Sequence, residues 1–152
     1  MFDYLLGLIG STKSIMIWMH AAHHVSKGTS FSGDHVNLFG EIYTEIADIY
    51  DDMVEKSIAC CDDELIACPI VTSQLAANII SSFDSPANLH SDQIAAIGLD
   101  LVSDYLNIVT QVYRELDAKN MLSLGMDDFL ASAAGKFEKF EYLLGQRVKK
   151  GY

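Results

Sequence analysis

This 152-residue sequence has few residues that interrupt helices and no obvious cysteine framework. Only two prolines occur, Pro69 and Pro86, so long uninterrupted helices are allowed. The three cysteines are an odd number without a Cys-x-x-Cys pair, which argues against a disulfide scaffold and against a zinc knuckle. We expect Cys60, Cys61 and Cys68 to be free or buried thiols in a reducing compartment.

Positive charge is also scarce. Ten lysines and arginines oppose 21 aspartates and glutamates, so the formal net charge is −11. Such a surface repels nucleic-acid phosphates and anionic membranes, and the final lysines, Lys149 and Lys150, do not make a basic tail, so direct DNA binding is not expected. The apolar residues 1–19 contain Asp3 and Lys13 and are too short and polar to span a bilayer. We interpret them as the first buried helix of a cytoplasmic protein with no membrane partner.

Apolar residues recur every three or four positions along most of the chain, which predicts helices and no strands. The expected helices cover about residues 2–26, 33–59, 72–83, 91–119 and 127–149. Ser32 and Ser91 are candidate N-caps, and Gly28 is a candidate for the residue that ends the first helix. Four long helices and one short helix predict an all-α four-helix bundle, formed as a single domain over 1–152. The long connection between the second and third long helices is typical of the ferritin-like variant, in which it crosses over.

The helix expected over 33–59 carries two stripes. Its apolar stripe begins at Val36 and continues through Phe39 and Tyr43. Its acidic stripe steps by three or four residues, where like charges repel by a few tenths of a kcal/mol per pair. This face is either an ordinary solvated surface or a surface that serves cations. Its members are Glu41, Glu45, Asp48, Asp52 and Glu55.

Four of the five histidines lie within one short stretch, at positions 20, 23, 24 and 35. Histidine and carboxylate together are typical ligands of iron, manganese and zinc, so a metal chemistry would start here. His20 and His24 are four residues apart and share a helix face. No Glu-x-x-His motif occurs, and the last two long helices contain no histidine, so the core of one bundle is a poor candidate for a di-iron site.

A site shared by two subunits fits the spacing better. His35 and Asp51 lie on the same expected helix, about 24 Å apart at 1.5 Å per residue, so they cannot bind one ion within a subunit. They can meet across a two-fold axis near Tyr43 if this helix packs antiparallel on its copy. His35, with His23, would then face Asp51 and Glu55 of the partner subunit.

The stretch from His23 to Glu55 resembles the signature of Dps, the DNA-protection-in-starvation branch of the ferritin superfamily. That family has a histidine, a basic residue with glycine, a phenylalanine and a second histidine, which correspond here to His23, Lys27, Gly28, Phe31 and His35. Its later Asp-x-x-x-Glu resembles the segment from Asp51 to Glu55. Residues 127–140 also resemble its last helix.

The resemblance implies a dodecamer-like homo-oligomeric shell in which Fe(II) is oxidised by peroxide or oxygen at two-fold interfaces and stored as mineral. It implies that His23, His35, Asp51 and Glu55 are the catalytic, metal-binding residues, with Mn or Zn as alternative metals. The acidic stripe, including Asp48 and Asp52, would face the cavity and nucleate mineral. His20 and His24 would be replacement ligands or a different metal site. Such a compact version would suit a phage, acting then in the host cytoplasm.

One more residue separates His35 from Asp51 than in the family. An extra residue turns a helix by about 100°, which would swing Asp51 away from its expected position. A π-bulge in this helix would absorb the extra residue. Without a bulge, the family positions fall on Tyr50 and Val54, whose side chains cannot ligate metal here.

Three functions therefore stay open from the sequence. The first is the Dps-like iron-oxidising and iron-storing shell, a ferroxidase. The second is a ferritin-like assembly without a functional metal centre, acting as a structural or partner-binding acidic protein. The third is a different helical metalloenzyme that uses His20, His23 and His24. The metal content of the purified protein would distinguish the first function from the second.

Overall fold

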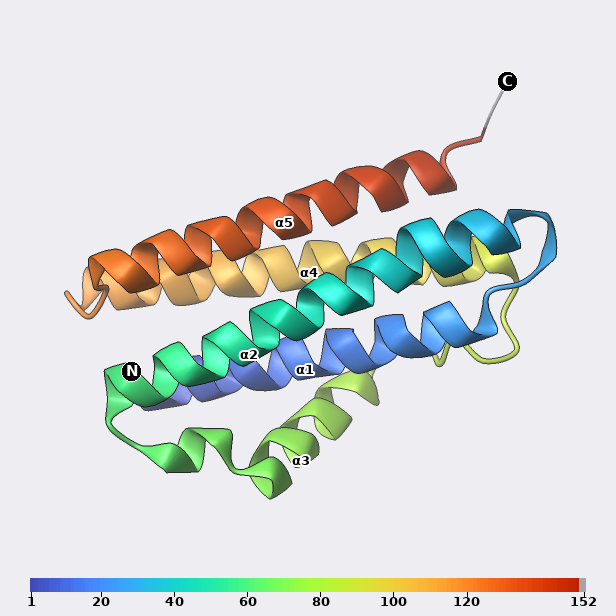
Figure 1. The fold of residues 1–152 in the computed structure, drawn as a ribbon. Helices are drawn as coiled ribbons and strands as arrows, with labels where there is room; N and C mark the ends of the chain where they lie inside the picture. The colour runs from blue at the N-terminus through green and yellow to red at the C-terminus, as the bar shows by residue number, and fades with distance from the viewer. Residues whose placement is uncertain (151–152) are drawn as a thin grey trace.

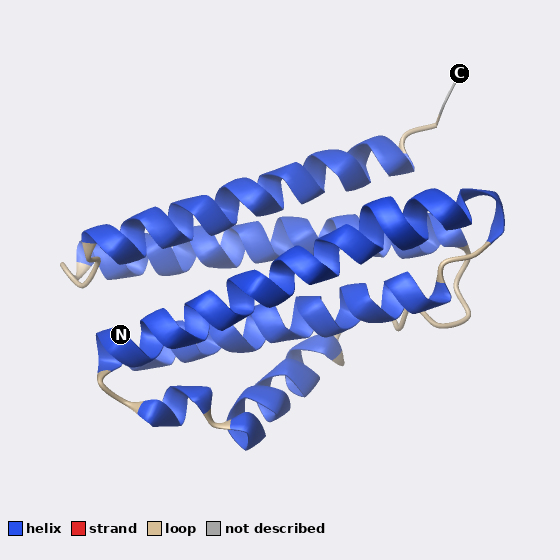
Figure 2. Cartoon of the chain, in the orientation of Figure 1, coloured by secondary structure: helices blue, strands red, loops and turns tan. Residues whose placement is uncertain are grey.

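The computed structural model describes residues 1–150, and this part of the chain is helical without any strand (Figure 2). The predicted all-α class is confirmed. The α-helices are α1 (Phe2–Val25), α2 (Glu41–Cys61), α3 (Pro69–Ile80), α4 (Ser91–Ala118) and α5 (Leu124–Val148). Shorter helical segments are η1 (Gly28–Ser30), η2 (Gly33–Gly40) and η3 (Glu64–Ala67).

The four long helices lie side by side, and the shorter α3 packs against α1 (Figure 1). Helices α1 and α2 run antiparallel, as do α4 and α5. The chain between α2 and α4 passes through η3 and α3 along the length of the molecule, so α2 and α4 run in the same direction. The crossover predicted from the length of this connection is therefore present.

One hydrophobic cluster joins the long helices. Its largest fully buried side chains include Trp18 of α1 and Phe137 and Phe140 of α5. The indole N–H of Trp18 donates to the backbone carbonyl of Asp84 at 2.9 Å, so the loop before α4 is fixed to the first helix. Each of these aromatic side chains buries a large apolar surface and therefore contributes strongly to the core.

A polar pair lies inside this core. The Thr12 hydroxyl donates to the carbonyl of Leu8 at 2.7 Å, and it lies 2.6 Å from the hydroxyl of Tyr105. Because Thr12 has one hydroxyl proton and gives it to Leu8, the Tyr105 hydroxyl is the donor toward Thr12. Burial raises the pKa of Tyr105, because the charged phenolate is disfavoured in the apolar core.

Several helix boundaries differ from the sequence prediction. Ser32 is not an N-cap, because it already has helical dihedral angles and its side chain caps nothing. The N-cap of α4 is His90, whose backbone N–H donates to the side chain of Gln93, so Ser91 is the first helical residue instead. Gly28 has a φ of +77°, as expected for a residue that ends a helix, but α1 ends before it.

The helices predicted over 72–83 and 127–149 both begin three residues earlier, at Pro69 and Leu124. Proline fits the first turn of α3 because its missing N–H would be unpaired there in any case. The Ser123 hydroxyl caps α5 by accepting from the N–H of Met126 at 3.1 Å. These local caps, rather than the apolar spacing, set the true start of each helix.

The three cysteines are free thiols near the end of α2 and the start of α3. Cys60 is exposed, and Cys61 and Cys68 are half-buried, so none of them is a core residue. Burial is the largest cause that raises the pKa of Cys61. Across residues 1–150, no helix is both long enough and apolar enough to cross a membrane.

Candidate metal centre

The helix predicted over 33–59 begins as a π-helix, η2, and continues as α2 from Glu41. A π-helix has i→i+5 hydrogen bonds, so its wider turns accommodate extra residues within the helix. The π-bulge that the spacing between His35 and Asp51 required is therefore present. The π-helix also explains why Val36 was wrongly placed in the apolar stripe. Val36 is 57% exposed, because α-helical spacing does not hold through a π-helix.

His23, in the last turn of α1, stacks on His35 of the π-helix. Their ring centroids are 3.9 Å apart and their planes differ by 13°. The Nδ1 of His23 lies 2.5 Å from the carbonyl oxygen of His35, and the Nδ1 of His35 lies 2.8 Å from the carbonyl oxygen of His23. A carbonyl oxygen only accepts, so each neutral ring carries its proton on Nδ1. Each Nε2 therefore keeps the lone pair that a metal ion needs.

Gly40 makes this close pairing possible. A Cβ at this position would lie 2.5 Å from the carbonyl oxygen of His35 and 3.2 Å from Nδ1 of His23. Any side chain here would push against the hydrogen bond that orients His23. The glycine at the end of the π-helix is therefore part of the structure that positions both rings.

The carboxylate of Asp34 fixes the start of the π-helix to the end of α5. This carboxylate is only 3% exposed and is bound by Arg147 from the last turn of α5, with Nε–Oδ1 at 2.9 Å and Nη2–Oδ2 at 3.1 Å. Arg147 also donates to Asp92 of α4 at 2.8 Å and to Ser30 at 2.9 Å. The hydrogen bond to Asp34 is the largest cause that raises the pKa of Arg147. Asp34 is thus a buried ion-pair partner that joins the π-helix to α5.

His20 and His24 form a second pair on α1, beside the first. Their ring centroids are 4.4 Å apart with planes tilted by 44°. His20 also stacks on Tyr43 of α2, with centroids 4.2 Å apart. Partial burial is the largest cause that lowers the pKa of His20, followed by the charges of His24 and His23. Tyr43, predicted near a two-fold axis, is half-buried and contacts histidines of its own subunit.

The predicted carboxylate ligands lie on the outside of α2. Asp51 and Glu55 are exposed, whereas the neighbouring Tyr50 and Val54 are half-buried and pack on the hydrophobic core. Asp48 and Asp52 are also exposed. Within residues 1–150 both ion pairs involve Arg147, so none neutralises an acidic residue of α2. The acidic face is therefore open to cations in the subunit as described.

The structure brings His23 to His35 and His20 to His24, but it brings neither pair to Asp51 or Glu55. No group of three or more His, Cys, Asp or Glu side chains able to hold a metal ion occurs in the described part of the chain. The third function, a metalloenzyme built on His20, His23 and His24 of one subunit, therefore has no assembled site in residues 1–150.

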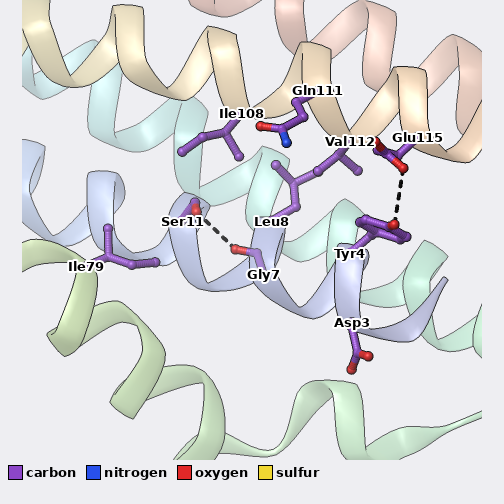
Figure 3. A pocket seen from close by; sticks show the side chains of 10 residues that line it. All are labelled: Asp3, Tyr4, Gly7, Leu8, Ser11, Ile79, Ile108, Gln111, Val112 and Glu115. Carbon is purple, nitrogen blue, oxygen red and sulfur yellow. Dashed lines mark hydrogen bonds between the residues drawn. The ribbon is translucent and has the colours of Figure 1, made fainter.

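A separate cleft lies between α1, α3 and α4 (Figure 3). It has a volume of about 340 Å³ and is lined mainly by apolar side chains such as Leu8, Ile108 and Val112. At one end the hydroxyl of Tyr4 donates to Glu115 at 3.2 Å. The cleft lies along the N-terminal half of α1 and includes no histidine, so it is separate from the histidine pairs.

Gly40, Asp34 and Arg147 support the centre and were not identified as supporting residues from the sequence. An isolated glycine within an apolar-periodic helix was a usable signal for Gly40, because such a glycine often marks a close approach. Asp34 and Arg147 are 113 positions apart, and no local pattern connects them. The chemistry offered is two imidazole Nε2 atoms and a row of exposed carboxylates, a donor set suited to divalent iron, manganese or zinc. No protein-family model matches this chain, and no curated protein sequence is significantly similar to it.

Proposed function

We propose that this chain is a Dps-like protein of the ferritin-like class. Its subunits oxidise Fe(II) at sites shared across two-fold axes and store the ferric product inside a homo-oligomeric shell. The observation that carries this proposal is the stacked His23–His35 pair, in which backbone carbonyls hold both Nδ1 atoms and leave both Nε2 atoms as donors. The π-helix beside it supports the proposal, since it accommodates the one residue by which the chain departs from the Dps spacing.

The donor set fits Fe(II) as a substrate. His23 and His35 of one subunit would supply neutral nitrogen ligands, and Asp51 and Glu55 of the partner subunit would supply two negative charges. Imidazole and carboxylate together suit iron, and two carboxylates balance the charge of one divalent ion. Asp51 and Glu55 are exposed and one helical turn apart, so both can reach one ion that approaches α2 from outside.

The chemistry of the site is electron transfer from iron to the oxidant. Two Fe(II) ions each give up one electron, and one hydrogen peroxide takes both electrons and two protons to become two water molecules. The carboxylates favour the ferric product because they stabilise the higher charge. The exposed acidic residues of α2 then provide the surface on which hydrated Fe(III) collects, if this face lines the interior of the shell.

The test is an anaerobic Fe(II) titration followed by peroxide addition, monitored by ferric absorbance. We expect saturable binding of about one or two ions per subunit and fast oxidation. His35→Ala and Glu55→Gln should each abolish saturable binding, whereas His90→Asn, which removes a distant exposed histidine, should not. If the wild type binds no more iron than a generic acidic surface, the ferroxidase proposal is wrong.

A mixing experiment tests whether the site is shared. When His35→Ala and Glu55→Gln subunits are unfolded and refolded together, each mixed dimer contains one site with both sets of ligands intact. About a quarter of the wild-type sites should therefore return, assuming random pairing of subunits. A site contained within one subunit would give no recovery.

The second candidate is a ferritin-like assembly without a metal centre that acts through its acidic surface. The unneutralised carboxylates of α2 favour it, because they suit a basic partner protein as well as a metal ion. A normal oligomer without saturable iron binding would select this function. A normal oligomer with saturable binding and fast oxidation would select the first.

A further inference from the structure

The rings of His20 and His24 are about as far apart as two imidazoles that share one ion. Both residues are exposed, and they lie one helical turn apart on the same face of α1. Their ring centroids are 4.4 Å apart. If two imidazoles bind one ion through bonds of about 2.0–2.1 Å at a right angle, their centroids lie about 4.5 Å apart, whereas a tetrahedral angle separates them by about 5.2 Å. The observed separation matches the right angle.

A neighbouring residue holds one ring of this pair in place, and the nearest other histidine pairs with a ring of its own. His20 stacks on Tyr43 at 4.2 Å, so its ring is already ordered before any ion binds. The ring of His23 stacks on His35 at 3.9 Å, which is closer than its 5.5 Å from His24 and its 6.3 Å from His20. No third His, Cys, Asp or Glu completes the set in residues 1–150, so water would fill the other positions around an ion.

We propose that His20 and His24 form a second metal site, which takes a late first-row divalent ion of tetragonal geometry, with Cu(II) as the preferred ion. Imidazole ligands and right-angle geometry select Cu(II) and Ni(II), and Cu(II) is the strongest binder in the divalent series. The site is independent of the iron centre, because it uses different rings and needs no residue of a second subunit. Its open water positions make the ion exchangeable.

The test is a titration of the whole protein with Cu(II), using glycine as a competing ligand, together with the electron paramagnetic resonance spectrum of the bound ion. We expect a tight site that is retained in His35→Ala, which disrupts the iron centre, and whose spectrum shows coupling to two imidazole nitrogens. His20→Ala and His24→Ala should each weaken this site by about a hundredfold, because either change turns a chelate into a single ligand. Ni(II) should bind at the same residues with lower affinity.

His90→Asn is the matched control, since it removes an exposed histidine that has no histidine one turn away, and copper affinity should stay unchanged. Circular dichroism confirms that each variant is folded. His24→Ala keeps the stacking between His20 and Tyr43, so it separates chelation from packing. Wild-type affinity in both His20→Ala and His24→Ala, or weakening in His20→Ala alone, would overturn the proposal.

Discussion

His23 and His35 orient each other through their backbones. The Nδ1 of each ring donates to the carbonyl oxygen of the other residue, at 2.5 and 2.8 Å. The last turn of α1 and the π-helix η2 are thereby joined at two points. The direction of both Nε2 atoms therefore follows from main-chain positions.

This pairing predicts the tautomer of both rings. In the metal-free protein at neutral pH, His23 and His35 should carry the proton on Nδ1, because only that form donates to a carbonyl. The ¹⁵N chemical shifts of the imidazole nitrogens report the tautomer directly. His90 provides the solvent-exposed reference. A proton on Nε2 with none on Nδ1, in either residue, would contradict the reciprocal hydrogen bonds.

Gly40→Ala should disrupt the pair. The added Cβ would lie 2.5 Å from the His35 carbonyl oxygen, and relieving this overlap should destabilise the protein by about 1–3 kcal/mol. Urea unfolding measures the change. Gly135→Ala on α5 is the matched control, because its Cβ meets nothing within 4 Å and should stabilise the helix by about 0.5–1 kcal/mol. Equal effects of the two substitutions would show that Gly40 is not needed for close packing.

Arg147→Met should weaken the fold near the histidines. It leaves the Asp34 carboxylate buried without its partner. Loss of a partner in a buried ion pair lowers the free energy of unfolding by about 3–5 kcal/mol. The loss should be somewhat smaller here, because the Arg147 side chain is 20% exposed. Asp92→Asn, at a side chain that is 87% exposed, should cost less than about 1 kcal/mol. Chemical denaturation compares the two. In hydrogen-exchange measurements, Arg147→Met should reduce the protection of backbone amides mainly in residues 28–40. A uniform reduction across all helices would contradict a local anchor.

Thr12→Val should destabilise the core by about 1–3 kcal/mol, because it leaves the buried Tyr105 hydroxyl without a partner. Tyr105→Phe should cost only about 1 kcal/mol, since Thr12 keeps its bond to Leu8. The double variant should be less destabilised than the sum of the two. Additive effects in this double-mutant cycle would show that the two hydroxyls do not interact.

Tyr105 should also make the folding stability of the protein depend on pH in the alkaline range. Its pKa in the folded protein is raised above the unfolded value of about 10, so the folded state keeps a proton that the unfolded state loses. The contribution of Tyr105 to stability is therefore present in full below pH ~10 and is lost as pH rises beyond it. Unfolding measured from pH 8 to 11 should show a smaller alkaline loss in Tyr105→Phe than in the wild type.

The sequence predicted the helices well because their apolar residues follow the helical period, and it predicted the crossover because only a long segment joins α2 to α4. It located both ends of α1 and α4 within one residue, but it placed the starts of α3 and α5 three residues late and assigned the N-cap of α4 to Ser91 instead of His90. The burial predicted for Val36 was wrong for a different reason. A π-helix changes the number of residues per turn, and no residue type in this segment indicates that change.

Within the candidate site, the sequence identified the histidines but not the residues that hold them in position. The partnership of Asp34 with Arg147 joins distant segments, and only the packed fold shows that they meet. The stacking of His20 on Tyr43 has the same origin, because it depends on how α1 packs on α2. The meeting of histidines with Asp51 and Glu55 depends on a second subunit and stays a prediction.

The contact between Arg147 and Asp34 has a consequence for the order of folding. Contacts between distant residues form late, because the intervening chain must be closed into a loop first. Helices α1 and α2 can pair as soon as both exist, but the segment between them gains its anchor at Asp34 only when α5 has docked. A chain still being synthesised that has not reached α5 would hold His35 on a segment that lacks this anchor. Full ordering of this segment is thus tied to completion of the bundle.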